Sequence, residues 1–66
     1  MIVRFVAPSK DDPNTTEEVG RFEASKLPAV GNEVRLPSGA FTVKNIAYEY
    51  FGTNDYHAVE ILLEAL

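Results

Sequence analysis

The side chains best suited to a specific interaction lie close together in the C-terminal third of the chain. They comprise three tyrosines, a phenylalanine, a histidine and two glutamates: Tyr48, Tyr50, Phe51, Tyr56, His57, Glu49 and Glu60. A tyrosine combines an apolar ring with a polar hydroxyl, which suits contact with another protein. Acids around such rings favour a basic or proline-containing partner. This segment is therefore the candidate protein-binding region.

The same rings also have a purely structural interpretation. Residues 48–51 and 56–57 fall on two expected strands joined by the turn 52–55, so the rings can form cross-strand pairs that hold a hairpin together. Alternation places Tyr48 and Tyr50 on one face of the sheet and Phe51 on the other. The sequence leaves open whether this aromatic hairpin belongs to the core or to an interface.

The chain contains few side chains that could take part in catalysis. His57 is the one histidine, and there is no cysteine. A general base needs a nucleophile and an orienting group within reach, and no serine lies in a nucleophile motif such as Gly-x-Ser-x-Gly. The lack of cysteine excludes disulfides, thiolate zinc sites and a cysteine nucleophile. We predict a protein without enzymatic activity and without a cofactor.

Oxygen donors that suit a cation gather around the segment 8–17. They are Asp11, Asp12, Asn14, Thr16, Glu17 and Glu18. A calcium loop needs ligands at fixed alternating positions around a central glycine, and the segment 8–17 contains no glycine. Prolines and short polar residues are typical of a solvated turn. We predict a solvated loop and no metal site.

The length and charge of the chain restrict its partners. A chain of 66 residues forms one domain, residues 1–66, with a stability of about 3–5 kcal/mol. So thin a margin favours a protein partner or self-association as a homodimer. Ten acidic against six basic residues argue against direct binding of nucleic acid or of anionic membranes. The same acidity supports a second hypothesis, an acidic nucleic-acid mimic that inhibits a host nucleic-acid-binding protein.

The hydrophobic pattern shows no targeting or membrane-spanning segment. The opening run of residues 1–6 is too short for a signal peptide, and its arginine comes too early. No stretch approaches the roughly 18 apolar residues of a membrane span. We expect a cytoplasmic protein.

Period-two alternation organises the chain that must position these groups. It predicts a strand over residues 1–7, in which Met1, Val3, Phe5 and Ala7 share one side, and Arg4 on the other side must reach solvent or find an acid. A weaker strand over residues 18–25 turns Phe22 inward and pairs antiparallel with the first strand across the loop.

A hairpin signal follows in residues 33–43. Val34 and Leu36 lead into the turn 37–39, in which Gly39 suits a positive φ, and a long strand then runs from residue 41 to about residue 51. The apolar spacing in this strand slips between Val43 and Ile46, which predicts a β-bulge near residues 44–45.

Residues 56–66 fit two kinds of secondary structure. Val59, Ile61 and Leu63 alternate as in a strand, whereas Ala58, Ile61, Leu62 and Ala65 also form a helical stripe. We prefer the strand, because a helix would leave the long preceding strand unpaired on one edge. The expected core then contains the apolar residues Phe5, Phe22, Val34, Leu36, Phe41, Val43, Ile46 and Ile61.

The resulting pattern predicts an all-β fold, a small five-stranded antiparallel barrel or strongly curled sheet. The run Leu27-Pro28-Ala29-Val30-Gly31-Asn32-Glu33-Val34-Arg35-Leu36, followed by Gly39-Ala40-Phe41-Thr42-Val43, resembles small Src-homology-3-like β-barrel proteins of bacteria, phages and mobile elements. The resemblance covers residues 1–7 and 27–66. It implies the barrel fold and an accessory protein of a phage or mobile element, and it assigns no functional residue.

Overall fold

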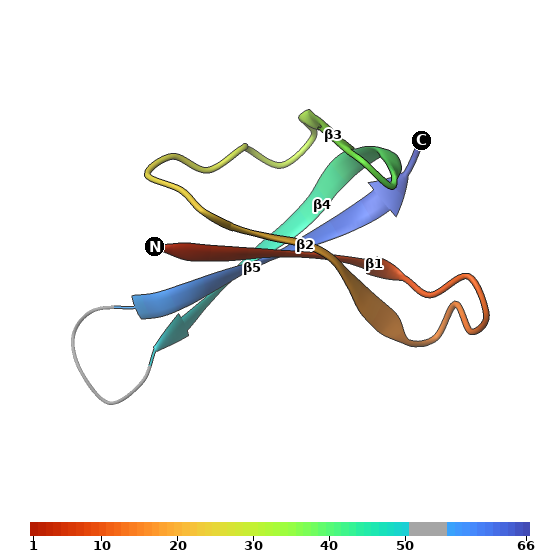
Figure 1. Ribbon diagram of the computed structural model, residues 1–66, viewed down its shortest axis with the longest axis horizontal. Helices are drawn as coiled ribbons and strands as arrows, with labels where there is room; N and C mark the ends of the chain where they lie inside the picture. The colour runs from red at the N-terminus through yellow and green to blue at the C-terminus, as the bar shows by residue number, and fades with distance from the viewer. Residues whose placement is uncertain (51–55) are drawn as a thin grey trace.

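A computed structural model describes residues 1–50 and 56–66, with the backbone alone described for residues 50, 56 and 57. Its elements are β1 (Ile2–Pro8), β2 (Thr16–Glu23), β3 (Glu33–Leu36), β4 (Gly39–Tyr50) and β5 (Tyr56–Ala65). They form one sheet in the order β2-β1-β5-β4-β3, which Figure 1 shows as a strongly twisted layer. The described residues contain no helix, and hence none that is able to cross a membrane.

Two hairpin units build this sheet. The first is the antiparallel pair β1–β2, and the second is the antiparallel series β3–β4–β5. The connection 24–32 leaves β2 near the N-terminus and leads to β3 at the far edge of the sheet (Figure 1). The units meet through β1 and β5, which run parallel with Arg4 opposite Glu60 and Phe5 opposite Ile61.

The parallel pair corrects the prediction of an antiparallel sheet. Alternation specifies which side chains share a face, and it does not specify the direction of the neighbouring strand. The two strands richest in buried apolar side chains, β1 and β5, occupy the centre of the sheet, where each has neighbours on both sides. The all-β class and the curled five-stranded sheet are confirmed, and the sheet is mixed.

The core covers one face of the sheet, here called the inner face. Its buried side chains come from the three central strands: Val3, Phe5 and Ala7 of β1, Phe41 and Val43 of β4, and Val59, Ile61 and Leu63 of β5. The partly buried Leu27 packs against this core from the connection 24–32. The prediction was right for Phe5, Phe41, Val43 and Ile61, whereas Val34, Leu36 and Ile46 are only partly buried.

Phe22 is the clear exception to the predicted core. Its side chain is 46% exposed, because β2 is an edge strand with β1 as its neighbour in the sheet. The ring lies edge-on to Phe5 at a centroid distance of 5.8 Å and also covers the backbone of Gly20. Phe22 therefore forms part of the rim of the inner face.

Register shifts at three places in the described strands, one of them between Glu49 and Tyr50 near the end of β4, accompany the bend of the sheet into a half-barrel. The register between β4 and β5 shifts between Val43 and Asn45, which confirms the bulge predicted near residues 44–45. A second shift between Phe5 and Val6 leaves Val19 of β2 without a register partner. The two edge strands consequently approach each other, and a Cβ built on Gly20 would lie 3.7 Å from Leu36 Cδ1.

The hairpin of residues 33–43 is confirmed, and Gly39 has a φ of +147°. Residues 56–65 form a strand, as preferred over the helix. The strand expected over residues 18–25 lies at residues 16–23, because the ladder with β1 continues to the pair formed by Pro8 and Thr16.

Candidate functional site

Tyr48 is the one residue of the predicted aromatic cluster whose side chain is described. It lies on β4 opposite Val59, in a row that continues across the inner face through Val3 to Phe22. The two valines are buried, with exposures of 0% and 1%, whereas Tyr48 and Phe22 are 47% and 46% exposed. Two half-exposed aromatic rings therefore flank the buried centre of this row, here called the aromatic row.

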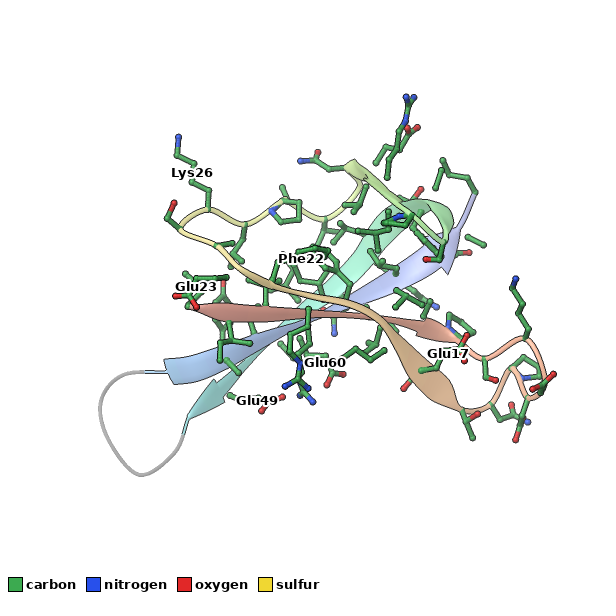
Figure 2. All side chains as sticks on the ribbon, in the orientation of Figure 1. Glu17, Phe22, Glu23, Lys26, Glu49 and Glu60 are labelled. Carbon is green, nitrogen blue, oxygen red and sulfur yellow. The ribbon has the colours of Figure 1, made fainter. Side chains whose placement is uncertain are left out.

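Glu49 and Glu60 lie on the opposite, outer face. Alternation along β4 and β5 turns them away from Tyr48 and Val59. The Arg4 guanidinium contacts both carboxylates, and its Nη2 lies 3.1 Å from Glu60 Oε2. Figure 2 shows Glu49 and Glu60 close together on the side of the sheet away from Phe22. The expectation that Arg4 must reach solvent or pair with an acid is therefore confirmed.

The remaining predicted site residues are described in part or not at all. Tyr50 and Tyr56 are register partners at the ends of β4 and β5, and His57 belongs to β5. Their side chains, and Phe51 as a whole, lie outside the described residues. The structure therefore bears on Tyr48, Glu49 and Glu60 alone among the side chains predicted to form the contact.

The described geometry separates the aromatic from the acidic part of the predicted site. Tyr48 belongs to the inner face, while Glu49 and Glu60 are about one-third exposed and share the single positive charge of Arg4 on the outer face. Arg4 Nε, in addition, is buried and finds no acceptor among the described residues. The outer cluster is thus an ion-pair network that links β1, β4 and β5, and on the inner face the two half-exposed rings of the aromatic row, Tyr48 and Phe22, stand apart from it.

A cavity that the sequence did not reveal lies at the other end of the inner face. It has a volume of about 300 Å³, and its wall is mostly apolar, with Ala7, Val19, Phe41 and Ala65 among the lining residues. Lys10 and Glu17 also line it, and both are exposed. The lining residues come from β1, β2, β4, β5 and two connections, so no local sequence pattern brings them together.

The oxygen-rich loop behaves as a solvated turn. Asp12 Oδ1 accepts a hydrogen bond from the Asn14 amide at 3.0 Å, and the Asp12 carbonyl accepts one from the Thr15 hydroxyl. Glu18 pairs instead with Arg21, 2.8 Å away. In the described part of the chain, no three carboxylate or imidazole side chains gather as metal ligands.

Comparison with known proteins identifies no relative of this chain. The chain matches no protein-family model, no curated protein and no solved structure.

Proposed function

We propose that the chain is a non-enzymatic protein-interaction module that contacts its partner through the aromatic row. The observation that carries the proposal is the half-exposed ring of Tyr48 beside the fully buried Val59. Tyrosine in this setting offers a rigid, half-exposed ring to a partner at a small cost in side-chain entropy. Phe22 at the other end of the row adds a second exposed ring.

The composition supports a basic partner. The chain as a whole carries a net charge of −4. A basic protein would therefore be attracted to the chain, and its association rate would fall with added salt. The accessory role in a phage or mobile element follows from the resemblance of residues 27–43 and is part of the same proposal.

Affinity capture with three purified baits tests the proposal. The baits are the parent chain, Tyr48→Ala and Leu66→Ala, incubated with lysate of the native host and analysed by quantitative mass spectrometry. Leu66 is the matched control, since it is 71% exposed and its amide bonds to Ala40, far along β4 from Tyr48. We expect a basic protein to be enriched by the parent and by Leu66→Ala, and to be reduced about tenfold with Tyr48→Ala, as for a moderate interface anchor.

A fold control accompanies the capture. Tyr48→Ala must retain the circular dichroism spectrum of the parent, because half of its side chain already lies in solvent. Equal enrichment by the parent and by Tyr48→Ala would refute the aromatic row as the contact surface. Analytical ultracentrifugation of the parent tests the alternative occupant, a second copy of the chain, which would appear as a homodimer.

The acidic nucleic-acid mimic ranks second. That function needs free carboxylates arrayed like phosphates on one face, and Glu18, Glu33, Glu49 and Glu60 each contact an arginine instead. The Src-homology-3-like fold is likewise a proposal: the curled five-stranded sheet supports it, and the parallel pair β1–β5 speaks against it.

A further inference from the structure

The 300 Å³ cavity lies where the half-barrel is open between its two edges. Strand β2 contributes Glu17 and Val19 to its wall, and the turn between β3 and β4 contributes Ser38. The edges approach at Gly20 and Leu36, next to these residues. The cavity is therefore a consequence of incomplete closure of the barrel.

The size and lining of this cavity suit a small amphiphilic molecule. Small-molecule sites have volumes of about 300–1,000 Å³ and are mostly apolar with a few polar groups, so 300 Å³ corresponds to a small ligand. Ala7 and Phe41, 4% and 9% exposed, belong to the folded core and present a preformed apolar wall. The apolar part of a ligand placed against them would be removed from contact with water.

The charges at the rim favour a cationic head group. Glu17 is the register partner of Ala7, so β2 holds its backbone at the wall, and its carboxylate makes no ion pair with a described residue. Glu18 is paired with Arg21, which leaves Asp11, Asp12 and Glu17 in segment 10–18 against the single ammonium of Lys10. The local field at the rim is therefore negative.

We propose that this cavity binds a small amphiphilic ammonium compound, with its apolar body against Ala7, Val19 and Phe41 and its cationic group beside Glu17. The site is independent of the proposed protein contact. The row that contains Tyr48 crosses β1 at Val3, and Ala7 lies four residues farther along that strand, about 13 Å away. Failure of either proposal leaves the other standing.

Nuclear magnetic resonance titration tests the site with three probes that share one apolar tail. Uniformly nitrogen-15-labelled protein is titrated at neutral pH and constant ionic strength with hexylammonium chloride, hexanol or sodium hexanoate. We expect saturable amide shifts at Ala7, Val19 and Ala65. Hexylammonium should bind about threefold more tightly than hexanol, because one solvent-exposed charge pair contributes an affinity gain of about that size. Hexanoate should bind more weakly than hexanol. The preference for the ammonium should shrink in high salt.

Two variants separate the charge from the cavity. Glu17→Gln should give hexylammonium and hexanol equal affinities, whereas Glu64→Gln, the same loss of charge at an exposed position that does not line the cavity, should keep the preference. Ala65→Leu should narrow the cavity and abolish the binding of all three probes. If Ala65→Leu fails to fold, Ser38→Leu narrows the cavity from the turn.

Three results would overturn the proposal. If the parent bound hexylammonium and hexanol equally, the proposed preference for a cationic head group would be wrong. Tighter binding of hexanoate would assign the controlling charge to Lys10 instead of Glu17. Shifts that do not saturate, or that map away from the cavity-lining residues, would show that the cavity holds none of these probes.

Discussion

Arg4 and Glu60 are register partners on the two parallel central strands, and Arg4 Nη2 lies 3.1 Å from Glu60 Oε2. The same nitrogen also contacts Glu49 of β4, so one guanidinium links three strands on the outer face. The three side chains are 29%, 39% and 32% exposed, which leaves the network partly accessible to water. Its contribution to stability is accordingly modest.

Replacing Arg4 by methionine tests this network. Arg4→Met keeps the apolar stem and leaves the carboxylates of Glu49 and Glu60 without their shared cation, so we expect a loss of about 1 kcal/mol in the free energy of unfolding. Urea denaturation followed by circular dichroism measures it. Arg35→Met is the matched control, because the pair of Arg35 with Glu33 is exposed and should be worth less than about 0.5 kcal/mol. Equal losses in both variants would contradict a special role for Arg4.

Gly39 provides a test of backbone conformation. Its φ of +147° is one that residues with a side chain rarely adopt, and an added Cβ would meet only Phe41 at ordinary contact distance. Gly39→Ala should therefore destabilise the domain by about 1–3 kcal/mol through backbone strain alone. Thermal unfolding compares it with Ser38→Ala in the same turn, for which we expect almost no change. A neutral Gly39→Ala would mean that the turn adopts another conformation.

Ile61 lies at the centre of the core, fully buried and opposite Phe5 on one side and Ile46 on the other. Truncation to alanine removes about 2–5 kcal/mol, which is comparable to the total stability of about 3–5 kcal/mol expected for a domain of this size. Ile61→Ala should therefore lose the folded state in water. Ile61→Val, at a cost of about 1 kcal/mol, should retain it, as judged by the dispersion of the amide spectrum. A well-folded Ile61→Ala would place the main core elsewhere.

Local sequence patterns predicted most of the strands and turns of this fold, but they did not predict how the strands are arranged in the sheet. The alternation in residues 1–7, the turn glycine at Gly39 and the slipped spacing after Val43 each specify local geometry, and all three are confirmed. The parallel pairing of β1 with β5 joins residues more than fifty positions apart, which no local pattern encodes. The cavity was missed for the same reason, since its wall is assembled from distant segments.

The candidate site shows the same division. The expectation that Arg4 must reach solvent or find an acid is confirmed, whereas the grouping of Glu49 with Tyr48 in one site is not, because the two lie on opposite faces of β4. The choice of Glu49 and Glu60 as the partners of Arg4 depends on the register of three strands, which the sequence alone does not supply. Sequence proximity grouped these carboxylates with the tyrosines, and the pleat of the strands separates them.

Gly20 and Phe22 form a coupled pair on β2. They are two residues apart and share the inner face, and the Phe22 ring lies so close that a Cβ on Gly20 would be 2.8 Å from its Cε2. In the parent, Gly20→Ala should cost about 1 kcal/mol or more, because the ring must leave its edge-on contact with Phe5.

Removing the ring should change the sign of that effect. In a Phe22→Ala background, Gly20→Ala meets no ring, and a residue with higher strand propensity should then stabilise β2 by about 0.5 kcal/mol. Urea denaturation of the four proteins in this double-mutant cycle gives the coupling, which we expect to exceed about 1 kcal/mol. Additive effects would show that the ring does not rest on Gly20. Phe22 would then be only an exposed surface residue, without a role in bringing β2 close to Leu36 of β3.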